Sequence, residues 1–293
     1  MTSPSTPTSP ALTVFQEHFD ALKRSRRRNS IVGGVIFVIC FIAAAIAGEF
    51  DPIRIAAGVP RIFEYIEKIL PQLSVSTFQE DMAYWFYGFP AWLALLWETV
   101  LMAYIATLLG TVGALALCFL AANNLSPGRK TYFVTRRILE IARTIPDLVY
   151  ALIFVFAFGL GPLAGILAIA IHSMGASGKL FAEAAENVNM KPVDGLKGVG
   201  ASWLQTMRFA VLPQVFPNFT SYTLWRFELN VRTAAVMGFV GAGGIGTELV
   251  TAIRMLYYED VSALVLMIVA TVMCIDLLCE KVRHKFIGKE NLA

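Results

Sequence analysis

Two arginines and a glutamate stand inside a stretch of sequence that is otherwise apolar enough to cross a membrane. The stretch reads RFELNVRTAAVMGFVGAGGIG and holds Arg226, Glu228, Asn230 and Arg232. On a helix, Arg226 and Asn230 share one face, whereas Glu228 and Arg232, four residues apart, share a roughly opposite face and can pair. Arg226 then remains as a net positive charge beside a neutral hydrogen-bond donor. Such a face would attract an anion without holding it tightly.

A charged side chain near the centre of a bilayer costs about 2.5–3.5 kcal/mol on insertion scales, so each such residue needs a reason to be there. We predict that Arg226 and Asn230 line a path for an anion. Glu228, Arg232 and His172 are weaker candidates for the same path. The alternative is structural: Glu228 and Arg232 hold helices or subunits together, and His172 is a packed neutral side chain. For Arg226 both interpretations stay open.

The composition is that of an integral membrane protein. The chain has 293 residues, of which 57% are hydrophobic and 15% charged, and its mean hydropathy is +0.64. Soluble domains carry about 25% charged residues. The alternating polarity of β-barrel strands is absent, so the predicted fold is all-α, because a helix satisfies its own backbone hydrogen bonds in lipid.

The hydrophobic pattern predicts a polytopic protein with about six transmembrane helices. Residues 148–178 are uncharged, and as one helix they would be about 46 Å long, too long for one crossing. The sequence Gly159-Leu160-Gly161-Pro162 is expected to break them into two helices. Pro213 and Pro217 are expected to kink the fifth span. The predicted spans are residues 31–48, 91–122, 143–159, 162–182, 209–240 and 261–279.

Positive charge indicates the orientation of the chain. Eighteen of the 24 Lys and Arg residues fall in segments that are cytoplasmic if the N-terminus is inside, and four fall in the external segments. Both termini are therefore predicted to be cytoplasmic, as tails over residues 1–30 and 286–293. The run KRSRRR, Lys23 to Arg28, is interpreted as the inside anchor of the first span and not as a nucleic-acid site. The external segment is residues 49–90, with a possible amphipathic helix at 61–70.

A polar segment between the fourth and fifth spans has the composition of a docking element. It reads DGLKGVGASWLQTMRFAVLP, from Asp194 to Pro213. Its glycines would let another protein approach closely, and Trp203 and Leu204 offer an apolar grip. We expect a short helix over residues 193–207. The alternative is an ordinary polar connector.

The spacing of this segment resembles a cytoplasmic signature of bacterial ABC-importer permeases. That signature is Glu-Ala-Ala, three residues, Gly, nine residues, Ile, one residue and Leu-Pro. Asp194 stands at the glutamate position, Gly200 at the glycine and Leu212-Pro213 at the end. The two alanines and the isoleucine are not matched. A literal Glu183-Ala184-Ala185 has no proline at the required distance and is interpreted as the end of the fourth helix.

The resemblance implies that residues 183–213 form a coupling loop that inserts into a groove of an ATPase subunit. The coupling residues that it implies are Asp194, Gly200, Trp203, Leu212 and Pro213.

A longer resemblance covers about residues 91–285, the expected permease core. Two stretches resemble the permease subunit of phosphonate ABC importers. One is the stretch that begins at Arg226, and the other runs from Arg143 to Gly175 and reads RTIPDLVYALIFVFAFGLGPLAGILAIAIHSMG. The resemblance implies a MetI-like permease fold in the bacterial inner membrane and transport of phosphonate. Phosphate, phosphite and, less closely, an amino acid such as methionine are alternative substrates.

The same resemblance implies the partners: a second copy of the chain, a cytoplasmic dimer of ABC ATPases, an external substrate-binding protein and the lipid bilayer. No catalytic residues, metal ligands or cofactor are expected in this chain. The sequence GAGGIG satisfies G-x-G-x-x-G, but a span precedes it and an external loop follows, so a dinucleotide site is not expected. The rival from another class is a stand-alone secondary transporter, which usually shows broken helices in repeated halves; no such repeat is found.

Overall fold

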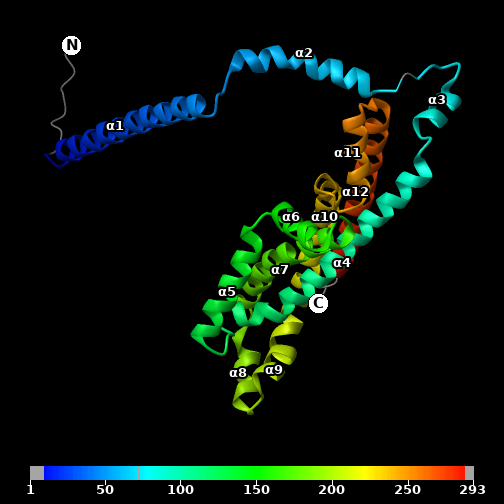
Figure 1. Cartoon of the computed structure of the whole chain (residues 1–293). Helices are drawn as coiled ribbons and strands as arrows, with labels where there is room; N and C mark the ends of the chain where they lie inside the picture. Colours follow the sequence, from blue (N-terminus) through cyan, green and yellow to red (C-terminus); the bar gives the residue numbers. More distant parts are fainter. Residues whose placement is uncertain (1–9, 72, 288–293) are drawn as a thin grey trace, which may run out of the picture. The chain divides into compact units, whose positions relative to one another are not determined.

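The computed structural model describes residues 10–71 and 73–287, and over these residues its regular elements are all helices (Figure 1). The predicted all-α fold is confirmed. The chain divides into two compact units, residues 1–66 and residues 67–293, which are described separately.

The first unit holds α1, Pro10–Ala47, and most of α2, Pro52–Ile69. All but the last residue of the predicted span 31–48 lies within α1, and the helix runs without a break through the basic sequence from Lys23 to Arg28. Residues 18–47 of α1 are long and apolar enough to cross a membrane. Residues 61–69 of the amphipathic helix predicted at 61–70 are part of α2, which buries none of its residues. The predicted tail falls on α1 from residue 10 onward, and residues 1–9 lie outside the described part.

The second unit holds the remaining helices. A π-helical turn at Met207–Val211 precedes α10, and a 3-10 turn at Gly238–Val240 follows it. The helices are α3 (Phe78–Trp85), α4 (Phe89–Ala121), α5 (Arg129–Thr144), α6 (Asp147–Phe158), α7 (Pro162–Glu186), α8 (Met190–Gly198), α9 (Trp203–Thr206), α10 (Leu212–Met237), α11 (Ile245–Met255) and α12 (Tyr258–Ile287).

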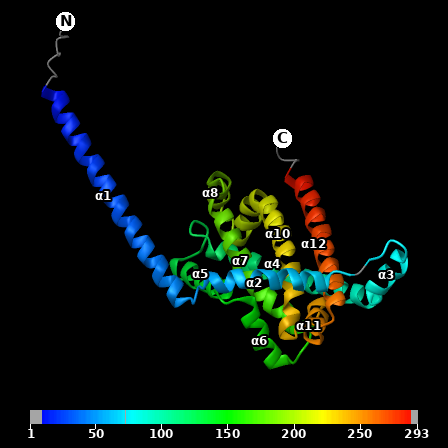
Figure 2. The same ribbon diagram turned by 90° about the horizontal axis from the view of Figure 1, so that it is seen from above.

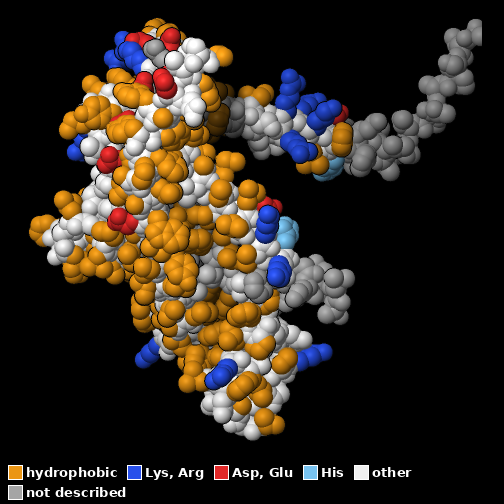
Figure 3. Space-filling model, turned by 90° about the vertical axis from the view of Figure 1, so that its right-hand side faces the viewer, with side chains coloured by type: hydrophobic (Ala, Val, Ile, Leu, Met, Phe, Trp, Pro, Cys, Tyr) orange, Lys and Arg blue, Asp and Glu red, His pale blue; other side chains and the backbone are white. Residues whose placement is uncertain are grey.

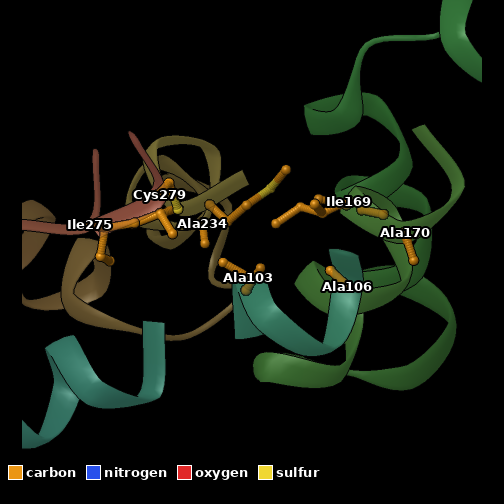
Figure 4. Packing of buried hydrophobic residues seen from close by; sticks show 12 residues of the cluster. Ala103, Ala106, Ile169, Ala170, Ala234, Ile275 and Cys279 are labelled. Carbon is orange, nitrogen blue, oxygen red and sulfur yellow. The ribbon is translucent and has the colours of Figure 1, made fainter. Parts of the chain in front are cut away.

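The core of the second unit is built from small side chains on α4, α7, α10 and α12. Figure 4 shows Ala103 and Ala106 of α4 facing Ile169 and Ala170 of α7, with Ala234 of α10 beside them. Small residues let helices approach closely in a membrane, where dispersion contacts drive their association. Hydrophobic side chains also cover the middle of the outer surface, as expected for contact with lipid (Figure 3).

Two ends of the second unit can be distinguished. Figures 1 and 2 both show α8 at one end and α6 and α11 toward the other. In the described residues, four helices are long and apolar enough to cross a membrane, and two bent helix pairs raise the number to six if each pair is one span. The prediction of about six spans agrees with this range.

The predicted third span, residues 143–159, is wrong as a single helix. The chain bends by 86° between α5 and α6. Pro146 causes the break, because the residue before a proline is pushed out of the helical conformation, and Ile145 has an extended ψ of 124°. The break predicted after Phe158 is confirmed: Gly159 and Gly161 have positive φ angles of 87° and 141°, and α7 begins at Pro162.

The segment after α7 also differs from the prediction. The fourth helix continues to Glu186, so the predicted boundary at residue 182 is four residues early, although Glu183-Ala184-Ala185 lies in the last turns as expected. The prediction of a single helix over residues 193–207 is wrong, because α8 ends before Gly200 and α9 begins after it. Gly200 forms a glycine C-cap: its φ is 82°, and its N–H donates to the Lys197 carbonyl at 3.0 Å.

The proline of the signature coincides with a change in the helix. Because Pro213 lacks an N–H and its ring crowds the preceding turn, a regular helix is strained just before it. The wider π-helical turn at Met207–Val211 occupies this place. α10 then continues through Pro217 to Met237, so the fifth predicted span is helical along nearly all of its length.

The sequence GAGGIG forms a tight turn between α10 and α11. Gly241, Gly243 and Gly244 all have positive φ angles, which only glycine adopts without strain. The Ile245 N–H donates to the Thr99 hydroxyl of α4 at 2.9 Å, and the Gly161 N–H donates to the Gly241 carbonyl at 3.0 Å. The turn therefore ties α11 to α4 and to the α6–α7 turn.

The close approach of Gly238 and Gly246 gives a test of this packing. A Cβ on Gly238 would lie 2.1 Å from the backbone carbon of Gly246, so backbone would have to move. We predict that Gly238→Ala destabilises the protein by about 3 kcal/mol or more and lowers its melting temperature in detergent. Gly195→Ala is the control, because a Cβ there meets nothing within 4 Å. Equal melting temperatures for the two variants would contradict the packing described.

Candidate functional site

A chain of hydrogen bonds links three helices in the second unit. Arg226 Nε of α10 donates to Ser173 Oγ of α7 at 3.2 Å, and this hydroxyl donates to Asn230 Oδ1 at 3.0 Å. Asn230 Nδ2 donates to Thr107 Oγ1 of α4 at 2.9 Å. Arg226 and Asn230 therefore lie on one face of α10, one turn apart, and meet at the same serine. We call Thr107, Ser173, Arg226 and Asn230 the polar chain.

Three members of the polar chain are buried: Ser173 is 1% exposed, Asn230 2% and Thr107 4%. Both ends of the Asn230 amide are occupied, which is what a buried amide requires. Asn230 therefore bridges α4, α7 and α10 in this structure. Its predicted contact with a passing anion stays a prediction, whereas its position beside Arg226 is set by these bonds.

Arg226 differs from the other members because it is only half-buried and carries a charge. Its Nε is bonded to Ser173, but its two terminal nitrogens form no hydrogen bond in the described part of the chain. Among residues 10–71 and 73–287, no carboxylate lies within 4.0 Å of it. The guanidinium is thus oriented on one side and free to bind on the other.

The other charges of α10 are neutralised by α12. Arg283 Nη2 of α12 lies 2.5 Å from Glu228 Oε1, and Arg232 forms an ion pair with Asp276 of α12. The predicted pair between Glu228 and Arg232 is wrong. Because α12 presents a base beside Glu228 and an acid beside Arg232, each charge finds its partner across the helix interface and not along α10.

Sequence reasoning missed four residues of this region. Ser173 and Thr107 gave no signal, because polar residues of this size are common in membrane helices. Asp276 did give one, since it is an acid within the predicted sixth span, and Arg283 stands two turns after it.

His172 precedes Ser173 on α7, but its ring does not join the polar chain. Its Nδ1 lies 3.1 Å from the Ile145 carbonyl, at the break between α5 and α6. The ring is half-buried. His172 therefore ties α7 to that break, and a role on the anion path stays a prediction.

The predicted coupling residues occupy two kinds of position. Asp194, Gly200 and Pro213 are exposed, and Leu212 is partly buried against a core cluster. Trp203 does not offer its side chain to another protein in the way predicted. It packs against the same cluster, and its indole N–H donates to the Leu125 carbonyl at 2.7 Å.

The apolar surface at this end comes instead from Val199 and Leu204. Their side chains are 80% and 70% exposed, on either side of Gly200. Separate Lys and Arg side chains are visible toward the lower end of Figure 3, where α8 and α9 lie.

The described residues hold no group of three or more His, Cys, Asp or Glu side chains arranged to bind a metal ion. The Ser173 hydroxyl donates to Asn230 and the Thr107 hydroxyl donates to the Ala103 carbonyl, so the donors of the polar chain that remain for an anion are the terminal nitrogens of the Arg226 guanidinium.

Residues 114–282 match the family model described as "Binding-protein-dependent transport system inner membrane component". The chain belongs to this family of inner-membrane permease components. The match includes Ser173, the charged residues of α10 and Asp276 of α12, and it ends one residue before Arg283. It also includes the segment from Asp194 to Pro213.

Two relatives carry names from transport of phosphorus compounds. Phosphite transport system permease protein PtxC of Stutzerimonas stutzeri is 36% identical over 257 residues, which cover 88% of each chain. PhnE2 of Escherichia coli (strain K12), whose name refers to a cryptic phosphonate transport system, is 45% identical over 122 residues. These residues are 42% of this chain and the whole of PhnE2.

The fold is that of an ABC-importer permease. The permease chain of a structure titled as an inward-facing conformation of the MetNI methionine ABC transporter superposes with a TM-score of 0.56. The two chains are 20% identical, and the superposition covers 67% of this chain and 95% of that one. The expected MetI-like fold and the permease family are confirmed.

The pair between Glu228 and Arg283 can be measured by a double-mutant cycle. Removing one partner leaves a charge without compensation between α10 and α12. We predict that Glu228→Gln and Arg283→Gln each lower the melting temperature in detergent, and that the double variant loses less than the two singles together. The expected coupling energy is about 1 kcal/mol or more.

The matched control is Glu280→Gln, an exposed acid on α12 whose side chain is 60% exposed. It should change the melting temperature little. Strictly additive effects of Glu228→Gln and Arg283→Gln would contradict a direct pair.

Proposed function

We propose that this permease moves a phosphonate anion inward across the bacterial inner membrane as part of an ATP-driven importer. The family, the phosphite and phosphonate systems of its relatives and an available cation in the membrane domain support this substrate class. Phosphite and phosphate are the alternatives, because they present the same oxygens to a guanidinium.

The observation that carries the proposal is the unpaired guanidinium of Arg226. Arg232 and Arg283 each have a carboxylate partner, whereas Arg226 has only the neutral hydroxyl of Ser173. A planar guanidinium binds a phosphonate through parallel charge-assisted hydrogen bonds. The α10–α12 pairs carry no net charge, so Arg226 is the arginine of α10 that is left without an ion-pair partner among the described residues and can bind an anion.

A single half-buried arginine fits a transport pathway better than a site that binds its ligand tightly. A pathway must attract its substrate and must also let it leave. Arg226 supplies one charged contact, without a second base among its hydrogen-bonded neighbours. Asn230, Ser173 and Thr107 then serve to orient the arginine.

The proposed importer has four further components: a second copy of this chain, two cytoplasmic ATPase subunits that hydrolyse ATP, and an external binding protein. Both termini lie in the cytoplasm, as the distribution of Lys and Arg supports. The end of the second unit that holds α8 and α9 faces the ATPase. Asp194, Gly200 and Pro213 lie on its surface, with Val199 and Leu204 as the apolar contacts.

The role of Arg226 can be tested by uptake. We predict that Arg226→Gln lowers ATP-dependent uptake of methylphosphonate at least about tenfold, since a hydrogen bond to a charged group contributes about 1.5–3 kcal/mol. Assembly with the ATPase should stay normal. Uptake of phosphite and phosphate, measured in parallel, identifies the preferred anion.

Lys130→Gln is the control for loss of one positive charge, because Lys130 is exposed at the start of α5. Uptake by the Arg226 variant equal to that of the control would rule out the proposed anion contact.

Docking of the ATPase can be tested at the exposed leucine. We predict that Leu204→Asp reduces the amount of ATPase subunit that copurifies with the permease, because a charge replaces an apolar contact at the interface. Leu70→Asp is the matched control, since Leu70 is an exposed leucine in the segment between α2 and α3. Normal copurification with the Leu204 variant would place the ATPase contact elsewhere.

A further inference from the structure

An apolar cavity of about 300 Å³ lies between α4, α7 and α10. Thr111 and Leu115 of α4 and Phe181 of α7 form part of its wall. The other lining residues belong to α10, where they lie between Leu212 and Leu224. These are the three helices that carry the polar chain. The cavity and the polar chain therefore share one scaffold.

The helical period places this cavity next to the polar chain. Thr223, which lines the cavity, precedes Arg226 by three residues on the continuous helix α10. Thr111 follows Thr107 by four residues on the continuous helix α4. Residues three or four apart share a face of a helix and are separated by about 4.5–6 Å along its axis. The cavity therefore begins about one helical turn from the polar chain, and it extends toward Leu212 at the start of α10.

The wall of the cavity is made mainly of carbon, and none of its described lining residues is charged. The Thr220 hydroxyl donates to the Phe216 carbonyl at 2.9 Å. The Thr223 hydroxyl donates to the Phe219 carbonyl at 2.8 Å, so both hydroxyls are used within α10. The Thr111 hydroxyl oxygen is buried without a hydrogen-bond partner in the described part of the chain. Such a wall favours an apolar group and cannot replace the water around an anion.

We propose that this cavity receives the organic group of a phosphonate whose oxygens bind Arg226, so that the pathway favours phosphonates with an apolar substituent. This inference rests on the proposed contact between Arg226 and the anion. A phosphonate carries its carbon substituent directly on phosphorus, so one end of the molecule is charged and the other is apolar. A guanidinium with an apolar cavity one helical turn away matches both ends.

The cavity would separate anions that a guanidinium alone binds alike. Phosphite has a hydrogen where a phosphonate has its organic group, and phosphate has a fourth oxygen. Phosphite therefore leaves the cavity empty, and the additional oxygen of phosphate finds no replacement for its water there. Each methylene that moves from water into an apolar site should instead strengthen binding about fourfold.

The test uses the complete transporter in liposomes, with its ATPase and binding protein, and a reporter cysteine in the cavity wall. Thr220→Cys is made in a chain without the four native cysteines and is treated with a membrane-impermeant thiol reagent. We predict that n-alkylphosphonates from methyl to butyl slow the reaction. The concentration that gives half-maximal protection should fall about threefold to fourfold for each added methylene. Phosphite should protect least.

Thr251→Cys is the matched control, because Thr251 is an exposed threonine of α11 whose hydroxyl also donates to a carbonyl of its own helix. It should react at the same rate with and without phosphonate. When Arg226→Gln is added to Thr220→Cys, every phosphonate should protect more weakly, while the dependence on chain length remains.

The outcomes separate the two proposals. Protection of Thr220→Cys that does not increase with chain length would overturn the cavity inference and leave the Arg226 contact intact. The inference would also fail if Thr220→Cys reacted only with a lipid-soluble reagent, as in a groove filled by acyl chains, or with no reagent, as in a face covered by a second copy. Protection that is unchanged by Arg226→Gln would instead overturn the Arg226 contact.

Discussion

The cost of an uncompensated charge in lipid is the constraint on which the rest of this structure depends. It explains why Glu228 and Arg232 pair with residues of α12, so that α10 and α12 are joined by ion pairs as well as by apolar packing. It also makes the one unpaired arginine of this helix informative. Arg226 is kept in place by a neutral serine, which orients the guanidinium without cancelling its charge.

A second constraint is close packing, which the chain meets with alanine and glycine. Alanines on α4, α7 and α10 let these helices approach until the polar chain can span all three. Gly238 and Gly246 let the α10–α11 turn fold back on itself, and Thr99 fixes that turn to α4. The close packing of α4, α7 and α10 therefore fixes the position from which Arg226 is oriented.

Much of the fold could be predicted because its signals are local. The helix break at Gly159–Pro162, the helical fifth span and the shared face of Arg226 and Asn230 follow from residue types and the helical period. The α5–α6 bend was missed because Pro146 acts through the residue before it, which an apolar pattern does not show. The partners of Glu228 and Arg232 were missed because they lie on α12, about 50 residues further along the chain. The exposed tip formed by Val199 depends on a left-handed glycine that spacing alone does not identify.

The central claim is that the Arg226 side chain faces the path of the anion. The most direct test replaces Arg226 with cysteine after removal of the four native cysteines, and measures reaction with a membrane-impermeant aminoethyl thiol reagent in the assembled transporter. The account predicts that the cysteine reacts, that methylphosphonate slows the reaction, and that the attached amine restores part of the uptake. A cysteine that does not react in any nucleotide state, or that reacts at the same rate with and without phosphonate, would contradict the account.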